Sequence, residues 1–308
     1  MNTILAITTL LTSPVMFVQQ PQRAPMFHTK AQRVIVDVFV SLHGKPITDL
    51  TKNDFEIIDN GVRQHEVSLL RTSTQPISSV LLIDTSSSVR GAKLAQLKNA
   101  ARTFISNLSS SDEIAIINFG TRYKLRQPLT NIKKKALETI NTMLGRGATS
   151  LYDSLHAAIV HAETGTGRAL VVVFTDGTDN SSWLTNKDLL ATAKASPTVI
   201  YAVRVGSNAG LFLGGEQRGQ GTFIENSSDL RGRGLLNNIA LVAGGRLISL
   251  KSAENLGTAF SDILYEMRSR YLLVYTPDAS SPGWHTLEVK LKKPIEATVR
   301  TRAGYFLR

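Results

Sequence analysis

Apolar and polar residues recur with two different periods along the central part of the chain, from residue 80 to about residue 266. Short runs rich in Val, Ile and Leu alternate with longer stretches in which apolar residues recur every three or four positions. The first pattern predicts strands buried on both faces, and the second predicts amphipathic helices. Strands are expected at 80–83, 113–119, 123–127, 169–174, 199–205 and 246–250, and helices at 93–108, 131–144, 150–163, 185–195, 235–242 and 253–268. Their alternation predicts a doubly wound, mostly parallel α/β sheet.

Both ends of the chain differ from this centre, because their patterns predict strands without helices between them. Strands are expected at 34–40, 271–275, 284–291 and 297–306. Asn60-Gly61 lies between two β-like runs and predicts a hairpin within 55–67. Neither end has enough strands for an independent domain, and the ends of a compact domain usually lie close together. We therefore expect residues 33–75 and 269–308 to form one small β-sandwich, with the α/β domain of residues 76–268 inserted in it.

The first residues form an uncharged, mostly apolar run that ends in the polar, proline-bearing stretch 19–22. This composition resembles an export signal, although no Lys or Arg precedes the run. The run is short for a membrane span, which needs about 20 residues, and no later segment could cross a bilayer. We expect residues 1–20 to be a signal peptide, with an uncleaved anchor as the alternative. The expected location is extracytoplasmic, either periplasmic or secreted.

Charge and composition narrow the possible partners and chemistries. The 308 residues include 35 Lys and Arg against 24 Asp and Glu, a net charge of +11, and no cysteine. Lack of cysteine excludes disulfides, thiolate metal sites and a cysteine nucleophile. The basic excess is spread along the chain, and its one tight run, Lys133-Lys134-Lys135, opens an expected helix as a solvated face would. Without a zinc-finger spacing or a basic-region helix, no nucleic-acid partner is expected.

Oxygen-bearing side chains follow two of the expected strands and one glycine-rich loop. They are Asp84-x-Ser86-x-Ser88 after strand 80–83, Thr149 at the end of 145–149, and Asp176 after strand 169–174. In a doubly wound sheet, ligands bind outside the carboxyl ends of the strands, so these segments are expected to converge. Carboxylate and hydroxyl oxygens suit a hard divalent cation, with water completing its shell.

This ordered set resembles the metal-ion-dependent adhesion site (MIDAS) of von Willebrand factor type A (VWA) domains. The flanks are similar to those of bacterial VWFA-related proteins through Leu50-Thr51-Lys52-Asn53-Asp54-Phe55, Asp59-Asn60-Gly61 and Tyr271-Leu272-Leu273-Val274-Tyr275-Thr276-Pro277. The resemblance implies a Rossmann-like VWA fold. It also implies a Mg²⁺ site, or one for Mn²⁺ or Ca²⁺, with the ligands Asp84, Ser86, Ser88, Thr149 and Asp176, directly or through water. The cation would take its last ligand from an Asp or Glu carboxylate of a partner protein.

Other residues near the expected site are less specific. Arg90 and Arg146 are expected to border the site and favour anionic ligands. It is equally consistent with the sequence that they are ordinary exposed arginines on loops. Asp179 extends the loop after Asp176 and is expected at the partner-binding rim or as a turn former. The glycine-rich segment 206–234 is expected to be a long loop on the same face, used for partner recognition or without fixed structure.

The sequence favours a binding module over an enzyme. It has no His-Glu-x-x-His motif, no Gly-x-Ser-x-Gly elbow and no Walker loop. We therefore expect an exported, non-catalytic, metal-dependent protein-binding module. One alternative is a metal-dependent phosphoesterase, although its chemistry would usually need more carboxylates or a second cation. Another is a scaffold domain that no longer binds metal.

Overall fold

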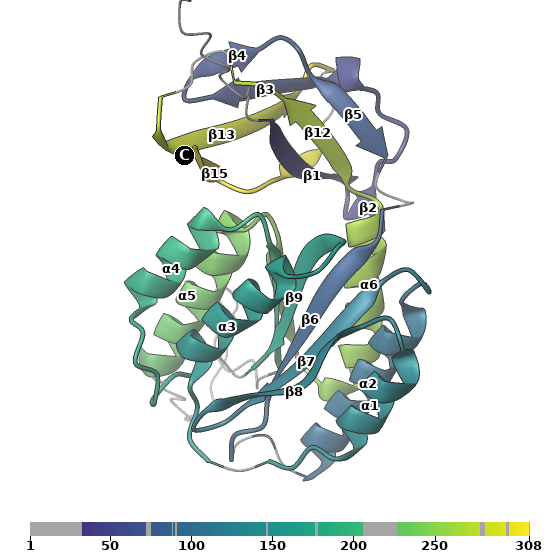
Figure 1. The fold of residues 1–308 in the computed structure, drawn as a ribbon, viewed down its shortest axis with the longest axis vertical. Helices are drawn as coiled ribbons and strands as arrows, with labels where there is room; N and C mark the ends of the chain where they lie inside the picture. The colour runs from purple at the N-terminus through teal and green to yellow at the C-terminus, as the bar shows by residue number, and fades with distance from the viewer. Residues whose placement is uncertain are drawn as a thin grey trace, which may run out of the picture. The chain divides into compact units, whose positions relative to one another are not determined.

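The computed structural model describes residues 33–71, 75–87, 89, 91–145, 147–175, 178–205, 227–277, 281–293 and 296–307. Figure 1 shows the described part as a helix-covered central sheet and a group of strands built from both ends of the chain. None of the helices in these ranges is long and apolar enough to cross a membrane.

The central sheet has six strands in the order β11-β10-β9-β6-β7-β8, of which only the edge strand β8 is antiparallel to its neighbour. The strands are β6 (Ile77–Asp84), β7 (Glu113–Phe119), β8 (Tyr123–Thr130), β9 (Arg168–Phe174), β10 (Val199–Val205) and β11 (Arg246–Leu250). The helices are α1 (Gly91–Asn107), α2 (Lys133–Asn141), α3 (Leu151–Glu163), α4 (Asn186–Ala195), α5 (Ser227–Val242) and α6 (Leu256–Arg268), with the short 3₁₀ helix η2 (Ala253–Asn255) before α6. The doubly wound, mostly parallel sheet that the sequence predicts is confirmed.

Two hydrophobic clusters cover the two faces of this sheet. Leu81 and Ile83 of β6 pack with α1, α2 and α6, whereas Val80 and Leu82 pack with α3, α4 and α5. Every residue of β6 is buried, as expected for a central strand that contributes alternate side chains to two cores. Figure 1 shows the same division, with α3, α4 and α5 on one side and α1, α2 and α6 on the other.

The strands outside the central sheet form a second region, called the β module below. Its strands are β1 (Val34–Leu42), β2 (Lys45–Pro46), β3 (Phe55–Asp59), β4 (Val62–Gln64), β5 (Ser68–Arg71), β12 (Tyr271–Tyr275), β13 (Gly283–Leu291), β14 (Thr298–Arg300) and β15 (Gly304–Leu307), with the 3₁₀ helix η1 (Lys52–Asp54) before β3. One sheet has the order β14-β1-β12-β5 and the other β15-β13-β3-β4. Strands from the two ends of the chain pair in both sheets, β1 with β12 and β3 with β13. A third hydrophobic cluster includes residues of both sheets.

Two expectations about single elements need correction, and a third is confirmed. The expected strand 297–306 is two strands in different sheets, β14 and β15, because 301–303 turn the chain between them. The expected loop 206–234 ends earlier, since α5 already begins at Ser227. Residues 206–226 lie outside the described ranges. The expected hairpin is confirmed at β3 and β4, where both Asn60 and Gly61 have positive φ, 48° and 81°.

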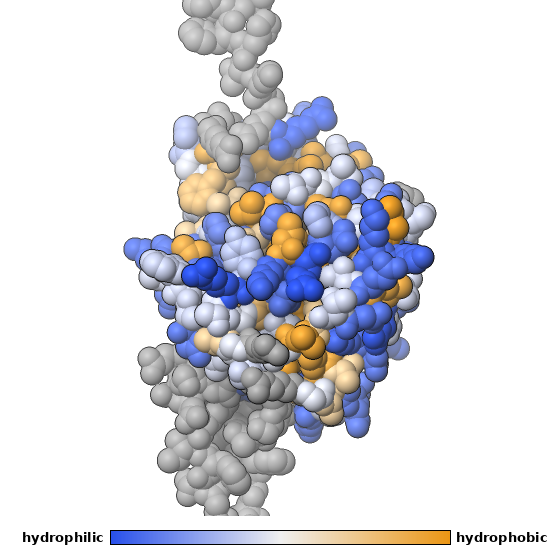
Figure 2. Space-filling model, turned by 60° about the horizontal axis from the view of Figure 1, so that its bottom comes forward, coloured by the Kyte–Doolittle hydropathy of each residue, from blue (hydrophilic) through white to orange (hydrophobic). Residues whose placement is uncertain are grey.

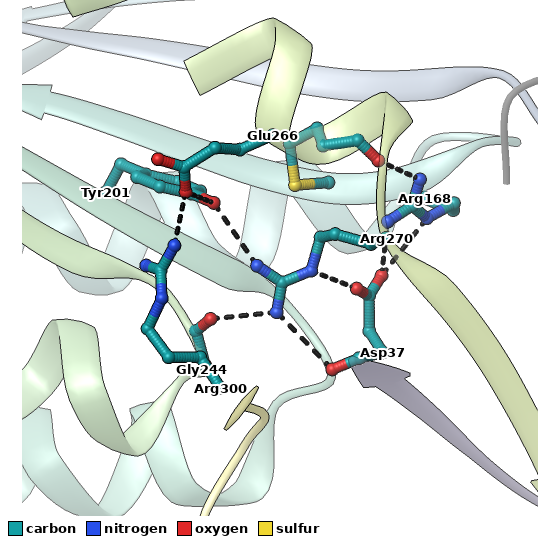
Figure 3. Close-up of polar contacts among 8 residues, drawn as sticks. Asp37, Arg168, Tyr201, Gly244, Glu266, Arg270 and Arg300 are labelled. Atoms are coloured by element: carbon teal, nitrogen blue, oxygen red, sulfur yellow. Dashed lines mark hydrogen bonds and ion pairs between the residues drawn. The ribbon is translucent and has the colours of Figure 1, made fainter. Parts of the chain in front are cut away.

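A buried charge network connects the β module with the amino ends of the central strands (Figure 3). Asp37 of β1 accepts hydrogen bonds from Arg168 Nη2 at 2.6 Å and from Arg270 Nε. Burial alone would raise the pKa of Asp37, but Arg168 and Arg270 outweigh this effect and lower it. Arg270 also donates to the Tyr201 hydroxyl at 3.2 Å and to Gly244 O at 2.8 Å.

The same network continues through an acidic residue of α6. Glu266 accepts hydrogen bonds from the Tyr201 hydroxyl at 2.9 Å, from Arg246 Nε at 2.8 Å and from Arg300 Nη2 at 2.5 Å. Burial raises the pKa of Tyr201 to about 12, so its hydroxyl remains protonated and able to donate. The network therefore pairs each of its two carboxylates with arginines from both regions of the fold.

Candidate functional site

Asp84 ends β6 and is fully buried at the carboxyl edge of the central sheet. Its Oδ1 accepts a hydrogen bond from the backbone N–H of Ser86 at 2.8 Å. Its Oδ2 accepts one from the Thr175 hydroxyl at 2.9 Å, and Thr175 directly follows the neighbouring strand β9. The carboxylate therefore joins the ends of two central strands, at the position where the sequence predicts a cation.

Three loops meet around Thr149, which is buried in the loop between α2 and α3. The Thr149 carbonyl accepts hydrogen bonds from the backbone N–H groups of Asn180 at 3.0 Å and Ser181 at 3.2 Å. Two residues earlier, Gly147 O accepts one from Ser87 N at 3.1 Å, in the loop that carries Ser86. The loops after β6, before α3 and after β9 are therefore in direct contact, as the predicted site requires.

Only part of the expected ligand set lies in the described residues. Asp84, Ser86 and Thr149 do, and the side chains of all three are buried. The expected ligands Ser88 and Asp176 lie outside the described ranges, as do the expected rim residues Arg90 and Arg146. Their placement in the sequence still puts Ser88 two residues after Ser86, and Asp176 directly after Thr175.

Asp179, expected at the rim or in a turn, accepts hydrogen bonds at the amino end of α3. Its Oδ1 accepts hydrogen bonds from Leu151 N at 2.7 Å, Tyr152 N at 3.4 Å and Ser182 Oγ at 2.6 Å. Backbone N–H groups in the first turn of a helix have no partner within the helix, so a carboxylate there stabilises the helix. Asp179 therefore ties the loop after β9 to α3.

The described side chains at this edge that could act as metal ligands suit a hard divalent cation. They are a carboxylate and hydroxyls, without a thiol, and hard cations such as Mg²⁺ take oxygen ligands. No group of three or more His, Cys, Asp or Glu side chains within the described ranges is placed to hold a metal ion. A site built mostly from hydroxyls would not form such a group.

A basic edge beside this site was not identified from the sequence. Arg122, directly before β8, and Lys124 and Arg126 of β8 line a hollow of about 590 Å³ next to Thr85 and Asn118. The signal was present in the sequence as three cationic residues at a spacing of two, a spacing that brings side chains to one side of an extended segment. On the carboxyl side of the sheet, the described surface is mostly hydrophilic, with small separate hydrophobic groups (Figure 2).

Comparisons with known proteins agree with this architecture. Residues 80–215 match the family model of the von Willebrand factor type A domain. A von Willebrand factor type A structure from Catenulispora acidiphila is 14% identical with a TM-score of 0.52, over 82% of this chain and 74% of that chain. Proximal thread matrix protein 1 from the mussel byssus is 15% identical with a TM-score of 0.50, over 75% of this chain and 50% of that chain.

Solved structures with lower TM-scores support no further conclusion about this chain. The PilB minor pilin from Streptococcus sanguinis is 15% identical with a TM-score of 0.47, and the match covers 63% of this chain. It spans 62% of the pilin, less than two thirds of its length. No curated protein sequence matches this chain. At these identities the structural likeness shows the fold alone, and the family is carried by the sequence match: the segment 80–215 belongs to the von Willebrand factor type A family.

Proposed function

We propose that this protein is a cation-dependent protein-binding module that works outside the cytoplasm. In this proposal Mg²⁺, or Mn²⁺ or Ca²⁺, is held by Asp84, Ser86, Ser88, Thr149 and Asp176, directly or through water. A partner protein supplies an Asp or Glu carboxylate as the last ligand. Because most of these ligands are neutral hydroxyls, the cation would keep a strong attraction for an additional carboxylate.

The observation that carries the proposal is the convergence of three loops on one edge of the sheet. Asp84 is buried there and accepts hydrogen bonds from Ser86 N and Thr175 Oγ1. The loop of Thr149 contacts both neighbouring loops through backbone hydrogen bonds. Membership of residues 80–215 in the VWA family supports the same interpretation.

Cation binding to purified protein tests the site assignment. Titration calorimetry with Mg²⁺ and Mn²⁺ should detect binding to the unaltered protein and none to Asp84→Asn or Asp176→Asn. Asp262→Asn is a matched control, because Asp262 is an exposed acid on α6. Unchanged cation affinity in the Asp84 and Asp176 variants, with the fold intact by circular dichroism, would overturn the assignment.

The absence of catalysis and the location are parts of the same proposal. A phosphoesterase that used Asp84 would hydrolyse p-nitrophenyl phosphate at a metal-dependent rate, and Asp84→Asn would remove this activity. We expect no such rate with Mg²⁺ or Mn²⁺.

Detection of the protein by fractionation of the native cell tests the proposed extracytoplasmic location, and recovery in the cytoplasmic fraction would contradict it.

We also infer that the β module is a β-sandwich that carries the inserted VWA domain. Pairing of β1 with β12 and of β3 with β13, together with the hydrophobic cluster common to both sheets, supports this view. Deletion of residues 269–308 should therefore expose the unpaired edges of β1 and β3 and cause aggregation. A soluble, monomeric deletion variant would contradict the inference.

A further inference from the structure

The start of the edge strand β8 and the residue before it present a row of positive charge, called the basic groove below. It consists of Arg122, Lys124 and Arg126, which are all exposed and all line the same hollow of about 590 Å³. A β-bulge at Arg126, opposite Ile116 and Ile117 of β7, interrupts the regular pairing there. Bulges commonly redirect a side chain, and here all three cationic groups still line one cavity.

Little in the described structure neutralises this charge. Neither Arg122 nor Lys124 has a side-chain hydrogen bond or an ion pair within the described ranges, and Arg126 donates to the neutral Thr142 Oγ1 at 3.1 Å. The described lining of the hollow includes no Asp or Glu. The acid Glu138 of α2 lines a neighbouring depression, together with Arg126 and Lys135. Side by side, these like charges favour an anionic ligand.

The basic groove is continuous with the proposed cation site. Thr85, which directly follows Asp84, lines the same hollow. Its hydroxyl accepts a hydrogen bond from Asn118 Nδ2 at 2.9 Å and donates one to Phe119 O at 2.8 Å. Gly147, another lining residue, accepts a hydrogen bond from Ser87 N. A chain that places one carboxylate at the cation can therefore continue into the groove.

The spacing of the groove residues indicates the form of that chain. Alternate residues of a strand lie on one face about 6.6–6.8 Å apart, and an extended peptide with acids at every second position has the same repeat. We propose that the partner binds through an extended acidic segment with alternating Asp or Glu residues, one carboxylate at the cation and the next ones along Arg122, Lys124 and Arg126. This inference rests on the proposed function and specifies its partner.

The described walls of the hollow favour a peptide over a nucleic acid. None of the described lining residues is aromatic, so the hollow offers no surface on which bases could stack. The intervening Tyr123 is not among the lining residues. Carboxylates at strand spacing therefore match the groove better than a single-stranded nucleic acid does.

Two blocked octapeptides test the proposal, one alternating Glu and Ser and one with a single Glu among Ser residues. Their affinities are measured by fluorescence anisotropy at 50 mM and 500 mM NaCl, with Mg²⁺ or with EDTA. The charge variant is Arg122→Gln/Lys124→Gln/Arg126→Gln. The control Lys45→Gln/Lys52→Gln/Lys292→Gln removes the same charge from exposed lysines of the β module. Circular dichroism and thermal unfolding confirm that both variants are folded.

We expect the alternating peptide to bind about tenfold more tightly than the single-Glu peptide at 50 mM NaCl, because up to three exposed ion pairs are added. This preference should disappear in the charge variant, remain in the lysine control and shrink at 500 mM NaCl, where charges are screened. Equal binding of the two peptides to the unaltered protein overturns the proposal. A preference that survives in the charge variant also overturns it.

Two further outcomes separate this inference from the proposed function. If EDTA leaves peptide binding unchanged while the charge variant loses the preference, the basic groove is supported and the cation-dependent function fails. If a single-stranded octanucleotide competes more effectively than the alternating peptide and its binding also needs the three basic residues, the groove is a nucleic-acid surface. That result would overturn the acidic-segment proposal.

Discussion

The two ends of the central sheet use charge in opposite ways. At the amino end, the carboxylates of Asp37 and Glu266 are each bonded by at least two arginines, and Arg270 is fully buried among them (Figure 3). At the carboxyl end, the buried Asp84 is hydrogen-bonded to a hydroxyl and a backbone N–H, and the basic row of β8 lies exposed in the solvent.

This difference separates charges that hold the fold together from charges that are available to a ligand. A buried carboxylate that is fully paired with arginines has no charge interaction left for a ligand. Removal of one member of such an ion pair leaves the other charge buried without a counter-charge. Exposed charges without partners contribute little to stability but can attract and orient an oppositely charged molecule. The comparison therefore predicts large stability effects at the amino end and mainly binding effects at the carboxyl end.

The largest expected effect is at the amino end. Asp37→Ala should lower the free energy of unfolding by about 3–5 kcal/mol, because it leaves the buried Arg270 without its carboxylate. Urea unfolding measures this loss. Glu288→Ala is the control, since Glu288 forms an exposed pair with Lys290 and should change the stability by less than about 1 kcal/mol. A loss below about 1 kcal/mol for Asp37→Ala would show that the network does not stabilise the fold.

A smaller stability loss is expected for the buried acid at the carboxyl end. Asp84→Ala leaves Ser86 N and the Thr175 hydroxyl without their acceptor, at a cost of about 1–3 kcal/mol. Urea unfolding in EDTA gives the loss without any contribution from a cation. If Asp84→Ala destabilises the protein as much as Asp37→Ala, the proposed contrast between the two ends is wrong.

A substitution of Asp179 distinguishes a structural role from a role in cation binding at the carboxyl end of the sheet. Asp179→Ala should cost about 1 kcal/mol, because it removes the carboxylate that accepts hydrogen bonds from the first N–H groups of α3. Calorimetry with Mg²⁺ should give the same affinity as for the unaltered protein. A tenfold weaker cation affinity would instead make Asp179 part of the metal site.

The central sheet was predictable from the sequence because its signals are local. The buried strand β9 is almost continuous in β-branched residues, and Asn60-Gly61 fits the left-handed turn between β3 and β4. The site segments follow strands, so the parallel topology alone brings Asp84 and Thr175 together.

Long-range pairings were not predictable in the same way. Asp37 and Arg270 are separated by 233 positions, and neither lies in a motif that identifies the other. The start of α5 was missed because Gly232 and Gly234 disfavour a helix, whereas Leu236 and Ile239 of α5 pack onto the sheet and stabilise it. Tertiary contacts decide such positions, and one sequence does not report them.

The smallest expected effect concerns a buried acid–base pair of the β module. His285 Nδ1 lies 2.8 Å from Asp59 Oδ1, and its Nε2 lies 2.8 Å from Ser281 O. Both contacts are satisfied together when the ring is protonated and donates from both nitrogens. Burial alone would lower the pKa of His285, but its hydrogen bonds to Ser281 and Asp59 outweigh that effect and raise the pKa.

A raised pKa in the folded protein means that protonated His285 stabilises the fold. This contribution should be complete below pH 6.5, the ordinary pKa of histidine, and should be lost as the pH rises through the raised value. Thermal unfolding between pH 5.5 and 9 should show the decline, which His285→Gln removes and His65→Gln, at an exposed position, does not. The same decline in His285→Gln would refute the assignment. Mg²⁺ affinity should not follow this decline, because His285 belongs to β13 of the β module and not to the loops that carry the proposed cation site.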